Sequence, residues 1–195
     1  MFKYKQAFIR NDQERYMTFL NNVLQGKATL HADNVAPYEL IRPYMTWNWN
    51  GPSLETMSKS EKDALNASWA SLLDFCSDED MLAVVDTSGS MHSSYGLPAA
   101  VALSLGLYLA EHNKGRFRNH FIEFSERPQL IRLKGETFVD KLRYILTFDE
   151  IADTNLEAVF QLILCVAVKN KLPQKELPGK LVIISDMEFN AASYT

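Results

Sequence analysis

Oxygen-bearing side chains gather at two places in the sequence, each directly after a run of apolar residues. Asp86-Thr87-Ser88-Gly89-Ser90 places a carboxylate and two hydroxyls at every second position, with a glycine that lets the loop bend back on itself. Asp186 follows the second apolar run, and Thr154 lies in a polar stretch between two expected helices. Oxygen ligands suit a hard divalent cation, so these residues predict a magnesium or manganese site.

The two apolar runs predict strands that are buried on both faces. They cover residues 82–85 and 180–185. Strands and helices alternate from residue 80 onward, which predicts an α/β fold with a doubly wound, mostly parallel sheet. Ligands of such sheets bind beyond the carboxyl ends of the strands, where the strand order reverses. Asp86 and Asp186 are therefore expected at the same edge of the sheet.

The other elements of this half follow from apolar periodicity and turn residues. Strands are expected over 120–124 and 129–133, and the short turn between them predicts an antiparallel hairpin. Helices are expected over 97–112, 136–146 and 155–169.

Residues 1–78 carry helical signals and are expected to form a helical N-terminal segment ahead of a domain over 79–195. Asn11 and Glu14 have the spacing of a capping box at the start of a first helix, and Ser58 and Glu61 repeat it ahead of a helix that reaches Cys76. A short helix is expected near 38–42. Cys76 and Cys165 lie in apolar helical patterns and are expected to pack as buried, reduced thiols.

The oxygen-rich pattern as a whole is similar to a known type of metal site. Asp86-x-Ser88-x-Ser90, followed by Thr154 and Asp186, resembles the metal-ion-dependent adhesion site of the von Willebrand factor A domain family over about residues 80–195. The loop continues into Met91, which resembles the intracellular branch that contains the Ro ribonucleoprotein A domain. The N-terminal half is similar to an uncharacterised family that fuses a helical segment to an A domain.

The resemblance implies a role for each of these residues. Ser88, Ser90 and Thr154 would coordinate Mg²⁺ or Mn²⁺ directly or nearly so, and Asp86 and Asp186 would bind it directly or through water. Neutral hydroxyls leave much of the metal charge uncompensated, so an Asp or Glu from a protein partner can complete the coordination shell. The expected function is a non-enzymatic, metal-dependent protein-interaction module.

Each residue also has a simpler interpretation. Thr154 and Glu157 have the spacing of a capping box at the start of the helix over 155–169. The hydroxyls of Ser88 and Ser90 are compatible with hydrogen bonds to the loop backbone. Asp186 is compatible with a helix cap. Glu188 is expected to be a solvated carboxylate.

Two further functions are considered as alternatives. Lys114, Arg116 and Arg118 flank Phe117 in a connection at the sheet edge opposite Asp86, which is typical of a solvated loop or of contact with RNA or an acidic partner. This feature favours an RNA-binding component of a ribonucleoprotein-like complex. A metal-assisted hydrolase needs a general base, and His92 beside Ser90 comes without a Gly-x-Ser-x-Gly elbow.

Composition and length limit the classes of protein and the functions that fit this sequence. The chain has 195 residues, 47% of them hydrophobic and 23% charged, with a net charge of −4, which predicts a packed globule and disfavours a nucleic-acid grip over the whole surface. No secretory leader and no stretch of about 18 apolar residues is recognised, so a cytoplasmic protein without a membrane span is expected.

The number of strands differs from that of the family that the loop resembles. A domains order six strands 3-2-1-4-5-6, whereas only four are recognised before Thr195. The A-type sheet is therefore expected to be truncated at its C-terminal side, with 180–185 as an uncovered edge strand. Either the chain is a fragment, or the N-terminal segment or another chain covers this edge, and oligomerisation through 180–185 is one outcome.

Overall fold

The computed structural model describes residues 5–28, 35–45, 52–76, 80–148 and 155–187. The described elements of the N-terminal part are helical, and strands begin at β1. In chain order, with η for a 3-10 helix, the elements are α1 (Lys5–Leu24), α2 (Pro37–Ile41), η2 (Arg42–Tyr44), α3 (Lys59–Ala70), β1 (Met81–Asp86), η3 (Gly89–His92), α4 (Ser93–His112), β2 (His120–Phe124), β3 (Gln129–Arg132), α5 (Phe138–Ile145), α6 (Leu156–Lys169), η4 (Gln174–Glu176) and β4 (Lys180–Ile184).

Four strands form one sheet in the order β3-β2-β1-β4. β1 pairs in parallel with β2 on one side and with β4 on the other, whereas β2 and β3 form an antiparallel hairpin. The prediction of an α/β fold with a mostly parallel sheet and one hairpin is confirmed. Because the chain leaves β1 toward β2 and later returns on the other side to form β4, the strand order reverses at β1.

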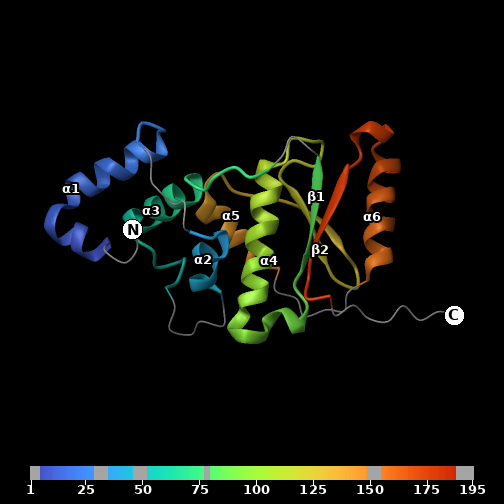
Figure 1. The fold of residues 1–195 in the computed structure, drawn as a ribbon, viewed down its shortest axis with the longest axis horizontal. Helices are drawn as coiled ribbons and strands as arrows, with labels where there is room; N and C mark the ends of the chain where they lie inside the picture. Colours follow the sequence, from blue (N-terminus) through green and yellow to red (C-terminus); the bar gives the residue numbers. More distant parts are fainter. Residues whose placement is uncertain (1–4, 29–34, 46–51, 77–79, 149–154, 188–195) are drawn as a thin grey trace.

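Helix α4 covers one face of this sheet and runs along β1 (Figure 1). A Cβ atom added at Gly106 would lie 2.3 Å from Cγ2 of Val85, so only glycine permits this close approach of helix and strand. Ser94, Tyr95 and Gly96 have positive φ values of 51°, 57° and 69°. The regular part of α4 therefore begins after Gly96, at the predicted start of the helix.

In the part of the chain that the structure describes, one segment has the length and apolar composition that a membrane-spanning helix needs. It is Gly89–His112, which includes α4. No apolar stretch of this length was expected from the sequence. In the structure, 56% of its most apolar window is buried, and α4 packs against β1 and α2. These contacts are those of a helix in a protein core.

Helix α6 covers the opposite face of the sheet, where Val159 packs with Ile122 and Phe124 of β2 (Figure 1). Only one stripe of α6 faces the sheet, although its sequence is apolar on nearly all sides. Phe160, Leu164 and Val168 are therefore 49%, 59% and 78% exposed.

The two cysteines differ from the prediction of buried thiols. Cys165 is exposed because it lies outside the α6 stripe that faces the sheet. Cys76 is half-buried and lies beyond α3, which ends at Ala70 and not near Cys76 as predicted.

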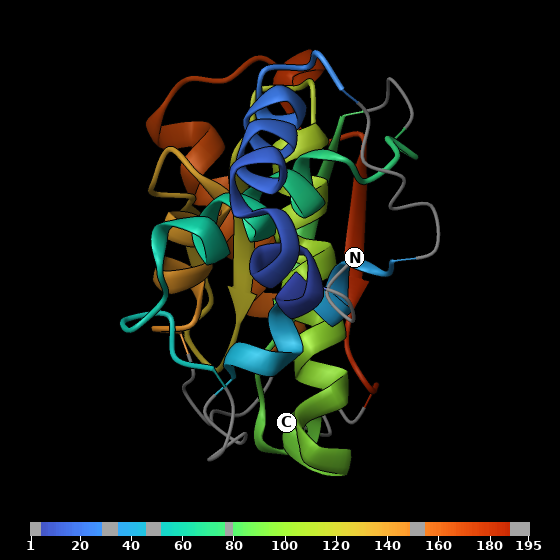
Figure 2. The same ribbon diagram turned by 90° about the vertical axis from the view of Figure 1, so that its left-hand side faces the viewer.

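The N-terminal helices pack on the α4 side of the sheet, and Figure 2 shows them in front of α4. The predicted capping box of Ser58 and Glu61 is confirmed at the start of α3. Helix α1 is interrupted at Asp12, whose Oδ1 accepts a hydrogen bond from the Arg15 backbone N–H at 3.0 Å. The predicted cap at Asn11 is thus wrong by one residue.

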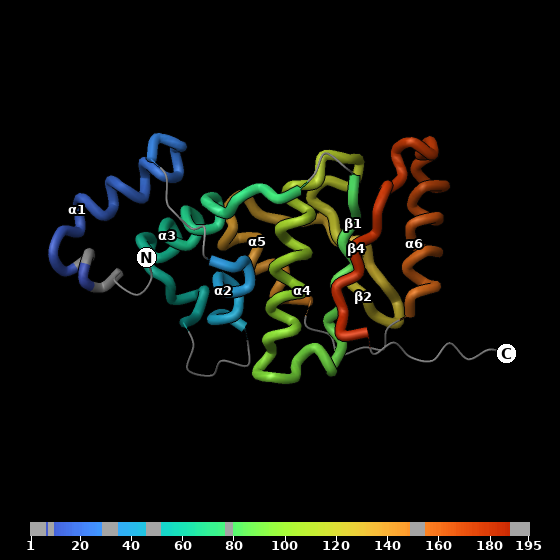
Figure 3. Tube along the Cα trace, viewed as in Figure 1, coloured from blue at the N-terminus to red at the C-terminus, as the bar shows by residue number. Residues whose placement is uncertain are grey.

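A shared hydrophobic cluster joins the N-terminal helices to the sheet domain. Trp69 of α3 stacks on Phe138 of α5 with ring centroids 4.2 Å apart, and the Tyr108 hydroxyl of α4 donates to the Leu73 carbonyl at 2.6 Å. β4 lies beside β1 at one edge of the described sheet (Figure 3). Among the described residues, no strand pairs with its outer side.

Candidate functional site

Four of the five predicted site residues lie where β1 and β4 end. Asp86 is the last residue of β1, Ser88 and Ser90 follow it, and Asp186 comes two residues after the end of β4. β1 and β4 are parallel neighbours in which Val85 pairs with Ile184, so both loops leave the sheet at the same edge. This edge is where the strand order reverses, which is the position at which α/β sheets bind ligands.

The Asp86 side chain is fixed from both sides of its carboxylate. Asp86 is fully buried, its Oδ1 accepts a hydrogen bond from the Ser88 backbone N–H at 2.8 Å, and its Oδ2 accepts one from the Ser185 hydroxyl at 2.5 Å. Each carboxylate oxygen retains a lone pair for a further donor, a water or a cation. The loop is therefore ordered around Asp86 by hydrogen bonds of the protein itself.

The hydroxyl oxygens of Ser88 and Ser90 lie 3.1 Å apart. Neighbouring ligands on an octahedral shell with metal–oxygen distances of about 2.1 Å lie about 3 Å apart. The spacing of the two hydroxyls therefore fits two adjacent positions of a magnesium shell. Their hydrogen bond to each other also means that they are not committed to the loop backbone, as the simpler interpretation of these serines required.

Three further residues were considered for this site from the sequence: Asp186, Thr154 and Glu188. Asp186 is exposed, and Thr154 and Glu188 lie outside the described residues. The cap of α6 is Asn155, whose Oδ1 accepts a hydrogen bond from the Ala158 backbone N–H at 3.0 Å. The interpretation of Thr154 as the cap of this helix is therefore wrong, because the next residue performs that role.

Two residues of this edge were not found from the sequence. Ser185 donates to Asp86, as described above, and Glu123 of β2 is a buried carboxylate beside the loop. The hydroxyls of Thr87 and Ser125 donate to its Oε1 and Oε2 at 3.1 and 3.0 Å. Glu123 therefore links the loops after β1 and β2. A charged residue inside an apolar strand was the available signal for Glu123.

The arrangement differs from metal sites built of several acids, histidines or cysteines. In the described ranges, no group of three such side chains converges. The oxygens at the Asp86 loop come instead from one buried carboxylate and two neutral hydroxyls. Such a set suits a hard cation that still needs further oxygen ligands.

His92 lies beside the loop, where a hydrolase would place a base. Its Nε2 lies 3.2 Å from the Thr87 carbonyl oxygen. Because a carbonyl only accepts, Nε2 carries the proton in this hydrogen bond. In this arrangement, Nε2 is not available as a base toward Ser90.

The basic segment lies at the other end of β1, as expected. The Asn113 side chain bonds the backbone of Met81 at the start of that strand. Arg116 lies 3.8 Å from Glu176, and Phe117 is buried in the core. The segment therefore presents charge to solvent but does not offer the Phe117 ring for stacking on a base.

The fold and this edge define an α/β protein with a loop of hydroxyls and a buried carboxylate at the reversal point of its sheet. Residues 80–195 match the family described as Domain of unknown function (DUF7788), and the chain belongs to that family. Residues 1–82 match a second family, Domain of unknown function (DUF2828).

One curated relative extends over nearly all of the chain. It is Uncharacterized protein L728 of Acanthamoeba polyphaga mimivirus, which is 30% identical over 186 residues, or 95% of this chain. The chain spans 31% of the length of that relative. No solved structure matches the chain.

Proposed function

We propose that the chain is a metal-dependent protein-interaction module of the von Willebrand A type, and that it binds Mg²⁺ or Mn²⁺ at the Asp86 loop. The observation that carries the proposal is the pair of Ser88 and Ser90 hydroxyls, 3.1 Å apart beside the buried carboxylate of Asp86. The strand order β3-β2-β1-β4 supports it, because this is the order of the first four strands of an A domain.

The residues present fit a cation with open coordination positions. Ser88, Ser90 and Thr154 would hold it through hydroxyls, and Asp86 and Asp186 directly or through water. Bound there, the metal would supply a positive centre that attracts the carboxylate of a partner's Asp or Glu. Ser185 and the Ser88 backbone hold the Asp86 carboxylate in place. The exposed position of Asp186 is compatible with a site open to a partner.

A binding role has more support than the alternatives. The His92 hydrogen bond to the Thr87 carbonyl occupies Nε2, so this nitrogen does not serve the hydrolase proposal as a base toward Ser90. RNA binding has less support because the Phe117 ring is buried in the core and is not available to stack on a base. Only the surface charge of Lys114, Arg116 and Arg118 remains for contact with RNA.

Calorimetric titration of Mn²⁺ and Mg²⁺ tests the metal proposal. The wild type is compared with the Ser88→Ala/Ser90→Ala double variant, which removes both hydroxyls without disturbing the buried Asp86. Ser93→Ala is the matched control, since Ser93 is an exposed serine of the same stretch. Saturable binding that the double variant loses and the control retains is expected. Undetectable binding to the wild type, or equal binding to the double variant, would contradict the proposal.

We also propose that copies of the chain associate with one another through residues 180–185. β4 lies at the sheet edge, and the neighbouring helix α6 exposes Leu164 and Val168. Sedimentation equilibrium should show a concentration-dependent mass that Leu164→Lys/Val168→Lys reduces to that of one chain. A wild type that sediments as one chain at every concentration would exclude this contact.

A further inference from the structure

Two exposed apolar side chains follow the same loops that carry the predicted metal ligands. Among the large apolar residues that the structure describes, Tyr95 is the most exposed at 88%, and Met187 is 69% exposed. Tyr95 follows Ser90 by five positions, and Met187 follows Asp186 directly. Each of the two loops at the Asp86 edge therefore presents an apolar side chain to solvent.

The structure brings the two loops to one end of the molecule. Helix α4 contacts both β1 and β4, and Ile184 at the end of β4 packs against the core cluster that contains Met91. Figures 1 and 2 show the start of α4 and the end of β4 at the same end of the sheet. Tyr95 and Met187 therefore lie at the same end of the molecule as the Asp86 loop.

The backbone holds both residues in a conformation that large side chains rarely adopt. Tyr95 and Met187 have positive φ values of 57° and 67°, in the left-handed region where glycine and asparagine are usual. The Met187 backbone N–H donates to the Ser185 hydroxyl at 3.0 Å, and the same hydroxyl donates to Asp86. Backbone strain of this kind is concentrated at binding sites and other functional sites. The chain thus keeps two exposed apolar residues here at a cost in conformational energy.

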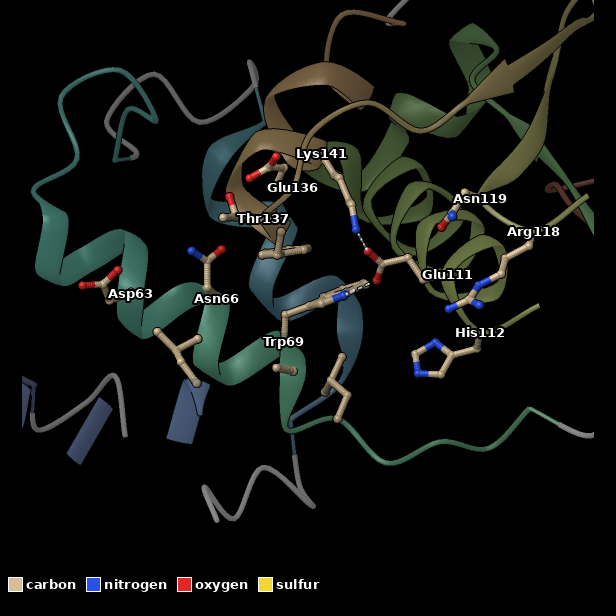
Figure 4. Close-up of a pocket in the computed structure, with 14 residues that line it drawn as sticks. Asp63, Asn66, Trp69, Glu111, His112, Arg118, Asn119, Glu136, Thr137 and Lys141 are labelled. Carbon is tan, nitrogen blue, oxygen red and sulfur yellow. Dashed lines mark hydrogen bonds and ion pairs between the residues drawn. The ribbon is translucent and has the colours of Figure 1, made fainter. Parts of the chain in front are cut away.

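The charged groups at the other end of α4 are compensated within the chain. A pocket opens there between α3, α4 and α5 (Figure 4). In this pocket the Glu111 carboxylate accepts from the Lys141 ammonium at 2.5 Å and from the Trp69 indole N–H at 2.6 Å. The exposed apolar residues at the Asp86 end are therefore the stronger indication of a surface that contacts a partner.

The Asp86 edge combines a site for a carboxylate with apolar side chains beside it. The carboxylate site rests on the metal proposed above, which takes an Asp or Glu of a partner. The ring of Tyr95 and the flexible thioether of Met187 suit contact with an apolar side chain. In an extended segment, side chains two positions apart project from the same face, about 7 Å from each other. One such segment can therefore reach the metal with its acid and an exposed apolar residue with its neighbour.

We propose that Tyr95 and Met187 determine which acidic residue the Asp86 loop accepts. The favoured partner is an extended protein segment that carries an aromatic or aliphatic residue two positions from its Asp or Glu. The metal supplies the attraction for the acid, and the two apolar side chains supply the selectivity for its neighbour.

The test is a selection from a displayed library of heptapeptides with Asp or Glu at the central position and every amino acid allowed elsewhere. The target is the full chain, in Mn²⁺ and separately in EDTA. Peptides selected in Mn²⁺ should be enriched in aromatic and aliphatic residues two positions from the acid. Tyr95→Asn/Met187→Asn should lose this enrichment, because the variant keeps the proposed metal ligands and removes only the apolar side chains.

Phe75→Asn is the matched control. Phe75 is 80% exposed, and its backbone N–H donates to the Tyr108 hydroxyl near the other end of α4. A peptide selected on the wild type is titrated into all three proteins in Mn²⁺. The Tyr95→Asn/Met187→Asn variant should bind it at least about tenfold more weakly than the other two, as is usual when a central aromatic contact is removed. The affinity for Mn²⁺ alone should be the same in all three.

Mn²⁺ titration separates the selectivity of the two side chains from the metal site itself. Normal Mn²⁺ binding, together with selected peptides that lack the apolar preference or bind the double variant equally well, would overturn the selectivity and leave the metal site in place. Undetectable Mn²⁺ binding to the wild type, or peptide binding that persists in EDTA, would overturn the metal-dependent recognition as a whole. Self-association that the double variant loses would assign the surface to a second copy of the chain and overturn the partner assignment.

The melting temperature separates a binding role of the two side chains from a structural one. Asparagine tolerates the left-handed conformation, so the double variant is expected to melt at the same temperature as the wild type or higher. A lower melting temperature would show that Tyr95 and Met187 stabilise the fold, and would contradict their role in recognition.

Discussion

The Ser185 hydroxyl donates a hydrogen bond to Oδ2 of Asp86 at 2.5 Å and ties the loop after β4 to the end of β1. The other oxygen of Asp86 accepts from the Ser88 backbone N–H, so the carboxylate cannot rotate without losing a bond. A functional group held in this way by its neighbours is ordered before any ligand arrives. Ser185 is thus a positioning residue of the proposed site.

Removing this hydroxyl should affect both stability and metal affinity. Ser185→Ala leaves one buried oxygen of Asp86 without its donor, so the free energy of unfolding should fall by about 1–3 kcal/mol. Mn²⁺ should bind more weakly because the carboxylate is no longer fixed. Urea unfolding and calorimetry measure the two effects, with Ser93→Ala as the control. Unchanged values of both quantities would show that the bond has no such role.

Thr154 and Asn155 should separate metal binding from helix capping. The side chain of Asn155 caps α6, so Asn155→Ala should lower the free energy of unfolding by about 1 kcal/mol and leave Mn²⁺ affinity unchanged. Thr154→Ala should weaken Mn²⁺ binding with little change in stability. Thermal unfolding and calorimetry on both variants test this. The opposite pattern would assign Thr154 to the helix and remove it from the proposed ligand set.

The packing of α4 on β1 should depend on Gly106. An added Cβ would meet Cγ2 of Val85 at 2.3 Å, so Gly106→Ala forces the helix and the strand apart. Overpacking of this kind costs about 1–3 kcal/mol, which exceeds the gain of about 1 kcal/mol from the higher helix propensity of alanine. Gly26→Ala is not a suitable control because Gly26 has a positive φ of 69°. Ser60→Ala, on α3, serves as the control instead. A Gly106→Ala protein as stable as the wild type would refute the close packing of α4 on β1.

The start of α5 should contribute an acid-sensitive part of the stability. The Thr137 hydroxyl and backbone N–H donate to the Asp140 carboxylate at 2.7 and 3.2 Å, and these hydrogen bonds hold the pKa of Asp140 below its ordinary value. A group whose pKa is lower in the folded chain stabilises it above the unfolded pKa. That stabilisation is lost as the pH falls through the folded pKa.

Urea unfolding of the wild type and Thr137→Ala between about pH 5 and about pH 2 measures this contribution. The variant should be less stable at the upper end of this range, and the difference should shrink as the pH falls. A difference that is independent of pH would mean that the cap does not act through the charge of Asp140.

The sequence was sufficient to predict the strands that carry the site. The runs over 82–85 and 180–185 are too apolar for a surface strand and too short for a helix, so a buried strand was the interpretation that fitted. Both were confirmed, and with them the common edge of Asp86 and Asp186. The capping box of Ser58 and Glu61 was found because both partners are local.

Contacts between distant residues could not be predicted in the same way. Ser185 bonds Asp86 across 99 positions, and Glu123 bonds Thr87 across 36, and neither pair has a local pattern. The cap of the first helix was placed one residue too early, at Asn11, and so was the cap that was the alternative to a metal role for Thr154, because adjacent polar residues have nearly equal capping propensity. The burial of Phe117 was missed because alternating basic and aromatic residues do not reveal which of them faces the core.

Paramagnetic broadening by Mn²⁺ tests metal binding at the Asp86 loop, because it locates the ion in the wild-type protein. Substoichiometric Mn²⁺ is added to the ¹⁵N-labelled chain, and the loss of ¹H–¹⁵N signals is followed residue by residue. If the ion binds at the Asp86 loop, the amide signals of Ser88, Ser90 and Asp186 should disappear first, while the indole signal of Trp69 persists. Uniform broadening, or broadening centred on any other part of the molecule, would contradict it.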